Sequence, residues 1–113
     1  MKEIKAYVRD STIAEVVQTL ESCGISGMTI THVQAILDWA DPDHFKYSLE
    51  TITKYTKVIK LELVCKDEDV SRLVDAIRIH ARTGQPGDGI IFVTDVKEAV
   101  KIRTGATGEK ALE

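Results

Sequence analysis

The chain of 113 residues is long enough to bury one hydrophobic core and too short for two, so we expect a single domain over residues 1–113. Hydrophobic residues make up 43% and the net charge is −3, which leaves no basic excess of the kind that nucleic-acid binding requires. No run approaches the roughly 18 apolar residues of a membrane span, and the first residues lack the apolar stretch of a signal peptide. A cytoplasmic location is therefore expected.

The first third of the chain predicts a strand, a helix and a second strand. Residues 2–9 alternate apolar and polar side chains at the period of a strand with one buried face. Residues 12–23 carry apolar side chains at helical spacing, and Thr12 with Glu15 fits a capping box at the start of this helix. Residues 27–34 are rich in β-branched side chains and alternate again, as a second strand does.

The second half of the chain predicts the same order of elements. Residues 58–65 alternate apolar and charged side chains, which favours a third strand. The polar segment 66–69 suits a helix start by capping and by dipole, and apolar residues at helical spacing follow it. Three further elements are expected towards the end of the chain, namely an apolar strand over 89–94, a short helical turn over 96–99 and a final strand over 100–104.

This order predicts an α+β fold, the ferredoxin-like βαββαβ sandwich, in which two helices cover one face of an antiparallel sheet. The opposite face is expected to be half polar and suited to subunit packing or to a ligand between chains, and it would carry Tyr7, Thr29, Thr31, Lys60, Glu62, Lys101 and Arg103. The tail over 105–113 has little to bury, so we expect it to be mobile unless it closes over something. Cys23 and Cys65 have no CxxC partner and are predicted to be small core residues.

A glycine-rich loop over 82–90 joins the second helix to the strand that follows it. Glycine adopts positive φ and lets a ligand approach the main chain, where successive N–H groups form an anion-binding concavity. The alternative is a helix C-cap at Gly84 followed by an ordinary turn. Lys101 and Arg103 occupy alternate residues of a predicted strand, so both would point to one face. The loop and these two cations together are consistent with a phosphate site.

A segment of more than twenty residues, 35–57, separates the second and third predicted strands. A connection this long in a compact domain is usually functional or mobile. Its aromatic residues Trp39, Phe45 and Tyr47 suit a partner-binding surface, although the segment could equally fold back on its own protein. Asp41, Asp43 and His44 are weak candidates for metal ligands, but such residues in a polar turn are mostly solvated, so no metal is expected.

Three segments of the chain together resemble the PII signal-transduction (nitrogen regulatory protein P-II) family. They are Gly-Met-Thr-Ile-Thr over 27–31, Thr-Gly-x-x-Gly-Asp-Gly-x-Ile-Phe-Val over 83–93 and Lys-Ile-Arg-Thr-Gly over 101–105. The resemblance implies a homotrimer of ferredoxin-like subunits with adenine nucleotides in the clefts between neighbours. It also implies that the long loop, the T-loop of that family, regulates a target protein such as a transporter or metabolic enzyme. Members of the family are regulators and not enzymes.

The resemblance assigns roles to individual residues. Gly87, Asp88 and Gly89 match the loop that approaches the nucleotide phosphates, and Lys101 and Arg103 match two basic phosphate contacts, with lysine at 101 where arginine is usual. Five residues match the walls around the adenine and ribose, namely Gly27, Met28, Thr29, Glu62 and Val64. For Met28 and Val64, packing within the sheet is an equal alternative.

The departures from the family pattern change the expected ligand. Ile90 stands where the family has a lysine after Gly-Asp-Gly, so phosphate-rich ligands lose one charge-assisted contact. The usual Gly-Phe-Gly-Arg-Gln opening of the long loop is Ala-Ile-Leu-Asp-Trp over 35–39, which removes the glutamine that helps to hold magnesium and 2-oxoglutarate. Thr51 matches the tyrosine that some members modify. We therefore expect ADP or AMP as ligand, with ATP as a further candidate, and no sensing of 2-oxoglutarate.

Two other functions stay open at this point. One is a metal-binding or metal-tolerance regulator of similar trimeric fold, which would use Asp41, Asp43 and His44. The other is a weak nucleotide hydrolase at the cleft. No Ser/His/Asp or Cys/His constellation is apparent in the sequence, so we predict that the protein is not an enzyme.

Overall fold

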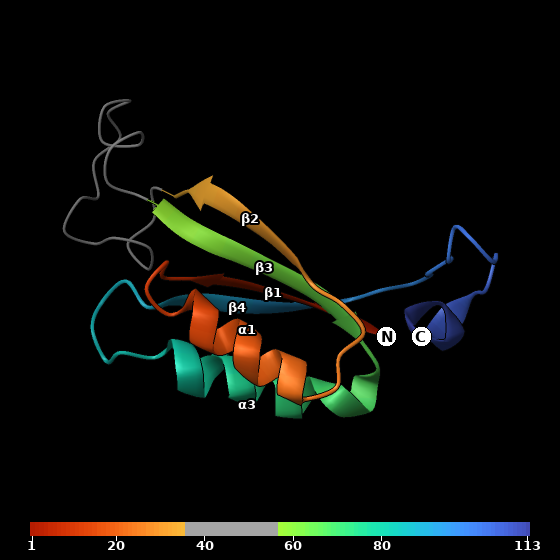
Figure 1. The fold of residues 1–113 in the computed structure, drawn as a ribbon, viewed down its shortest axis with the longest axis horizontal. Helices are drawn as coiled ribbons and strands as arrows, with labels where there is room; N and C mark the ends of the chain where they lie inside the picture. Colours follow the sequence, from red (N-terminus) through yellow and green to blue (C-terminus); the bar gives the residue numbers. More distant parts are fainter. Residues whose placement is uncertain (36–56) are drawn as a thin grey trace.

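Four antiparallel strands and two helices form the body of the protein in a computed structural model, which describes residues 1–35 and 57–113 (Figure 1). The sheet has the strand order β2-β3-β1-β4, and every pairing in it is antiparallel. The ferredoxin-like prediction is confirmed. The elements are β1 Lys2–Val8, α1 Ile13–Ser22, β2 Thr29–Gln34, β3 Lys57–Cys65, the 3₁₀ turn η2 Asp67–Asp69, α3 Val70–Ala81, β4 Gly89–Asp95 and the 3₁₀ helix η3 Gly108–Leu112.

The strand β1 is central because it pairs with β3 on one side and with β4 on the other. Its alternating apolar residues Ile4, Ala6 and Val8 are buried, as the period of two requires. Ala6 lies opposite Leu61 of β3, which is also fully buried. One face of the β1–β3 pair therefore forms the floor of the hydrophobic core.

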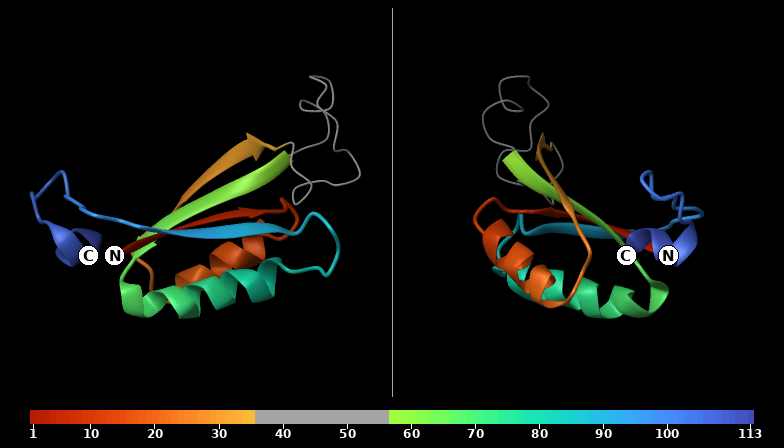
Figure 2. Two further views of the ribbon diagram at one scale, coloured as in Figure 1. Left: turned by 180° about the vertical axis from the view of Figure 1, so that it is seen from behind. Right: turned by 45° about the vertical axis from the view of Figure 1, so that its right-hand side comes forward.

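Both helices cover that face, which leaves the opposite face of the sheet open (Figure 2). Val16 and Leu20 of α1 and Leu73 and Ile77 of α3 are buried in the same cluster as the strand residues. In each helix these two positions are four residues apart, the spacing that places side chains on one side of a helix. Cys65 is buried and Cys23 packs against the cluster, and both are free thiols, as predicted for small core residues.

The predicted capping box at the start of α1 is wrong. The Thr12 hydroxyl donates to the Arg9 carbonyl oxygen at 3.2 Å, so it stabilises the turn before the helix and does not cap a free N–H group. The Glu15 carboxylate lies 2.9 Å from Nδ1 of His80 on α3. Both predicted capping residues are thus used in other contacts, and the Glu15 contact joins the two helices.

The predicted helical turn over 96–99 and the predicted strand over 100–104 are also wrong. After β4 the chain runs beyond the sheet, and Val100 makes an isolated bridge with Thr107. Lys101 and Ala106 close a tight turn, in which the Gly105 N–H donates to the Lys101 carbonyl at 2.8 Å. Lys101 and Arg103 are therefore not part of the open sheet face. The segment has too short an alternation of apolar residues to stabilise pairing with another strand, and its turn-forming residues fold it into a local turn.

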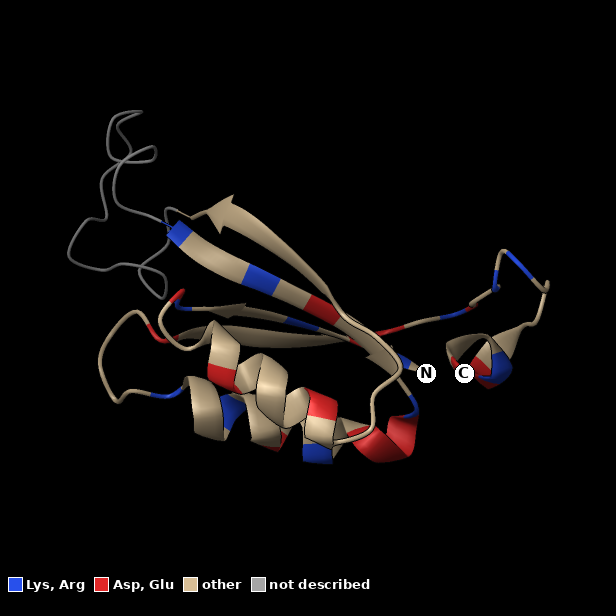
Figure 3. Cartoon of the chain, viewed as in Figure 1, with Lys and Arg blue, Asp and Glu red and all other residues tan. Residues whose placement is uncertain are grey.

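The η2 turn is held by charge. Asp67 accepts from the N-terminal ammonium group at 2.8 Å, and Asp69 pairs with Arg72 at 3.2 Å. Elsewhere basic and acidic residues are interspersed along the strands and helices (Figure 3). Within the described residues, no helix is long and apolar enough to cross a membrane.

Gly89 provides a direct test of the contact between β4 and β1. Its φ is +110°, and a Cβ added there would lie 1.7 Å from the Tyr7 carbonyl oxygen. We expect Gly89→Ala to lower the free energy of unfolding by at least about 2 kcal/mol, because backbone strain and a steric clash add. The measurement is urea unfolding at a single protein concentration.

Gly105→Ala is the matched control for this prediction. Gly105 also has positive φ, +73°, but a Cβ there would meet nothing within 4 Å. It should therefore lose only the roughly 1 kcal/mol of left-handed backbone strain. Equal losses at the two positions would show that the approach of β4 to Tyr7 is not tight.

Candidate functional site

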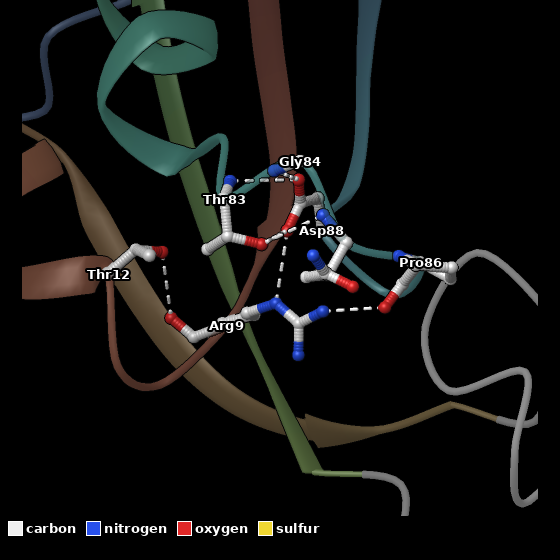
Figure 4. Close-up of polar contacts among 7 residues, drawn as sticks. Arg9, Thr12, Thr83, Gly84, Pro86 and Asp88 are labelled. Atoms are coloured by element: carbon white, nitrogen blue, oxygen red, sulfur yellow. Dashed lines mark hydrogen bonds and ion pairs between the residues drawn. The ribbon is translucent and has the colours of Figure 1, made fainter.

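The glycine loop between α3 and β4 is organised around the carboxylate of Asp88 (Figure 4). One oxygen, Oδ2, accepts from the backbone N–H groups of Thr83 and Gly84, each at 2.9 Å. The other oxygen, Oδ1, accepts from the Thr83 hydroxyl and from Nε of Arg9 at 3.1 Å. The carboxylate thus closes the loop on itself and fixes it to the end of β1.

Positive φ angles allow the loop to turn at three glycines, Gly84, Gly87 and Gly89, with φ of +87°, +97° and +110°. Gly87 is buried and Gly84 is exposed. The alternative of a helix C-cap at Gly84 is wrong in its position, because α3 ends at Ala81 with Arg82 as its C-cap. The Asp88 carboxylate gathers four donors in this loop.

The pKa of the Asp88 carboxyl lies well below its ordinary value. Burial opposes ionisation of this group, but hydrogen bonds from Thr83, Arg9 and the Gly84 N–H stabilise the carboxylate and outweigh the burial. Asp88 is therefore ionised at neutral pH and acts as an acceptor. A carboxylate whose accepting positions face its own loop is a structural anchor and not a proton donor or base.

Arg9 is a part of this site that sequence reasoning missed. It follows β1 directly, and its guanidinium also donates from Nη2 to the Pro86 carbonyl oxygen at 2.6 Å. Thr83 is part of the family pattern but was not predicted as a site residue, although its hydroxyl and its N–H group both donate to Asp88. A single sequence holds no signal for Arg9, because its contact spans 79 positions and arginine after a strand is ordinary.

The predicted adenine and ribose residues, termed the adenine wall, lie between the middle of the sheet and the end far from the glycine loop. Thr29 lies directly opposite Glu62 in the β2–β3 pairing, and Val64 lies opposite Glu3 of β1. Gly27 and Met28 come just before β2, and Met28 packs against the core. Glu62 is half-buried and lies 3.3 Å from the Lys60 ammonium group.

One subunit does not bring the two groups together. Val64 pairs with Glu3 of β1, whereas Gly89 pairs with Val8 of the same strand. Five residues of an extended strand span about 17 Å. The glycine loop therefore lies at one end of the sheet (Figures 1 and 2). Val64 lies towards the other end, and Thr29 and Glu62 lie between them, level with Lys5.

The two predicted phosphate cations lie beyond the end of the sheet that is far from the glycine loop. The segment that carries them leaves the end of β4 where Asp95 pairs with Lys2. The Lys101 ammonium group donates to the Glu113 carbonyl, and Arg103 is exposed in the turn. The predicted alignment of these cations on one face of a strand is wrong, since no strand forms there.

The candidate residues of the long loop lie outside the described residues. These are the partner-binding candidates Trp39, Phe45 and Tyr47 and the metal candidates Asp41, Asp43 and His44. Among residues 1–35 and 57–113, no three His, Cys, Asp or Glu side chains cluster as metal ligands would.

The fold and this loop define a class of protein, a ferredoxin-like α+β subunit with a glycine loop anchored by one aspartate. The sequence matches the family described as "Nitrogen regulatory protein P-II" over residues 1–106. The chain belongs to this family. PII proteins are signal transducers and not enzymes, so the prediction of a non-enzymatic regulator holds.

Similarity to individual relatives extends over nearly the whole chain. A nitrogen regulatory protein P-II of Bradyrhizobium diazoefficiens is 36% identical over 112 residues, which cover 99% of this chain and 100% of the relative. A nitrogen regulatory protein P-II 2 of Methanothermobacter thermautotrophicus is 39% identical over 116 residues, with 99% and 97% covered. Identity at this level is consistent with a divergent member of the family.

The Asp88 network predicts how stability depends on pH. The folded-state pKa of Asp88 is depressed, so its stabilisation is present above the unfolded-state value and is lost as the pH falls below about 4 towards the folded-state value. In Asp88→Asn the free energy of unfolding should be lower at neutral pH and should fall less steeply below pH 4 than in the parent. Urea unfolding at several pH values measures both slopes.

Other carboxylates contribute to the acid sensitivity of both proteins. Asp67 has a lowered pKa through its hydrogen bond with the N-terminus, but it is present in parent and variant alike. The difference between the two curves therefore reports Asp88. Parallel curves would contradict the role of the ionised carboxylate as the anchor of the loop.

Proposed function

We propose that this PII protein is a homotrimer that binds an adenine nucleotide in the cleft between neighbouring subunits. The single observation that carries this proposal is the separation of the glycine loop from the adenine wall and the cations by the length of β1. A site that uses both groups needs the loop of one chain and the opposite sheet end of another. Point-group symmetry then gives one such cleft for each subunit.

The open sheet face supports association of this kind. Tyr7 and Phe92 pack edge to face with ring centroids 6.3 Å apart, and Phe92 remains 45% exposed. Ile90 lies on the same face opposite Tyr7, and Ile102 beyond the sheet is fully exposed. A second and third copy of this chain would remove these apolar groups from water.

The chemistry of the loop supports a ligand with few phosphates. The position that follows Gly89 holds Ile90, which contributes no charge, and Asp88 is neutralised by Arg9. Lys101 and Arg103 of the neighbouring chain are then the cations that contact phosphate. We therefore propose ADP or AMP as the preferred ligand, with ATP as a weaker one.

The long loop over 35–57 is proposed to regulate the target protein, such as a transporter or metabolic enzyme, through Trp39, Phe45 and Tyr47. It leaves the sheet after β2 and returns at β3, at the end of the sheet where Gly89 pairs with Val8. This places its base close to the glycine loop, as coupling between nucleotide and target requires. The expectation that no metal binds at Asp41, Asp43 and His44, the mobile tail over 105–113 and the cytoplasmic location stay predictions from the sequence.

The first test is Arg103→Ala. Arg103 is exposed and outside the core, so this variant should keep the unfolding midpoint of the parent. It should weaken ADP binding by about 1–3 kcal/mol, since a charge-assisted contact is lost. Isothermal titration gives the affinity, and sedimentation at micromolar concentration gives the trimer. A monomeric parent, or unchanged ADP affinity in the variant, would contradict the proposal.

The second test compares ligands on the parent protein. We expect AMP or ADP to bind at least as tightly as magnesium-ATP, and 2-oxoglutarate to add nothing, because Ile90 and the opening of the long loop lack the usual lysine and glutamine. Titration of each nucleotide with and without 2-oxoglutarate decides this. Tighter magnesium-ATP binding in the presence of 2-oxoglutarate would show that other residues have taken over these roles.

A further inference from the structure

Arg9 contacts the glycine loop at two residues, one on each side of Gly87. Its Nε donates to Oδ1 of Asp88 at 3.1 Å, and its Nη2 donates to the Pro86 carbonyl at 2.6 Å. Gly87 lies between these two partners and has a φ of +97°. The planar guanidinium therefore spans the turn at Gly87 (Figure 4), where a flexible backbone would otherwise sample several conformations.

The contact continues through Asp88 to the start of the loop. The second carboxylate oxygen of Asp88 holds the N–H groups of Thr83 and Gly84, so the chain from Thr83 to Asp88 is fixed at both ends. The Arg9 side chain is only 32% exposed and that of Asp88 only 25%, so water competes less for their contact than at an open surface. Arg9 itself is held by the turn that begins α1, where its carbonyl accepts from Thr12.

We propose that Arg9 is the positioning residue of the nucleotide site. By bridging Asp88 and Pro86 it holds residues 83–88 in the phosphate-receiving conformation before the nucleotide arrives. The proposal deepens the proposed function and rests on it for the identity of the ligand. If the loop is already ordered before the nucleotide binds, the binding free energy is not reduced by the entropy cost of ordering the loop.

Arginine and lysine act differently in this position, which makes the proposal testable. A lysine ammonium keeps the positive charge but lacks the planar fork, so it does not reproduce the two contacts of Arg9 together. If Arg9 acts by position, Arg9→Lys fails in the same way as Arg9→Ala. If Arg9 acts by its charge on the phosphate, Arg9→Lys retains the affinity of the parent.

The control variant is Arg78→Ala. Arg78 is an exposed residue near the end of α3 and lines the same hollow as Asp88. Its carbonyl oxygen accepts from the Arg82 N–H at 3.1 Å, a backbone contact that alanine keeps, and within the described part of the chain its side chain has no hydrogen bond to the loop. The control therefore removes one positive charge from the neighbourhood of the loop without removing a contact to it.

The first measurement is amide hydrogen exchange in the nucleotide-free protein. In Arg9→Ala and Arg9→Lys, the amides of Thr83, Gly84 and Gln85 should exchange about tenfold faster or more, while those of α1 and α3 keep the rates of the parent. Arg78→Ala should match the parent throughout. Unchanged loop rates in both Arg9 variants would overturn the proposal, and so would faster exchange over the whole protein, which would indicate a general loss of stability.

The second measurement is ADP affinity by titration. Both Arg9 variants should weaken binding by about tenfold, and Asp88→Ala combined with Arg9→Ala should lose little more than either single variant, because the two residues act as one unit. Full affinity in Arg9→Lys, beside a loss in Arg9→Ala, would overturn the proposal in favour of a direct contact with phosphate. If the parent does not bind ADP, the proposed function fails, while the exchange rates still decide the role of Arg9 in the loop.

Discussion

The pairing of β1 with both β3 and β4 fixes how far the glycine loop lies from the predicted adenine residue Val64. Because β1 is the central strand, its register places Val64 opposite Glu3 and Gly89 opposite Val8, at opposite ends of one sheet. The buried residues of β1 are also the floor on which both helices pack. No change in a loop brings the two ends together without breaking this core, so a site that needs both ends has to be completed by another chain.

The proposed site would draw its two halves from the two ends of the sheet. At one end the Asp88 carboxylate gathers Thr83, Gly84 and Arg9 into an anchored loop. At the other end the segment after β4, which carries Lys101 and Arg103, runs beyond the sheet. The affinity for a nucleotide bound between chains would depend on both the association of the subunits and the conformation of the glycine loop. Binding of the nucleotide would thereby influence the long loop, because the base of the long loop lies close to the glycine loop.

Much of the fold could be predicted from the sequence because it depends on local periodicity. The alternation of Ile4, Ala6 and Val8 and the helical spacing of Leu73 and Ile77 each report burial directly. The predictions of a capping box at Thr12 and of a strand over 100–104 were wrong. Short polar segments can form hydrogen bonds with several alternative partners, and only the tertiary structure determines which partner is used. Arg9 was missed for the same reason, since its partners Pro86 and Asp88 are remote in sequence.

Subunit complementation tests the shared cleft most directly. Asp88→Ala impairs the loop and Arg103→Ala removes a cation, and neither homotrimer should bind ADP with the affinity of the parent. When the two variants are unfolded together and refolded, about one cleft in four should combine an intact loop with intact cations from two different chains. The account predicts that this fraction of clefts recovers the affinity of the parent. A mixture that binds no better than the separate variants would contradict it, because the loop and the cations would then have to come from one chain.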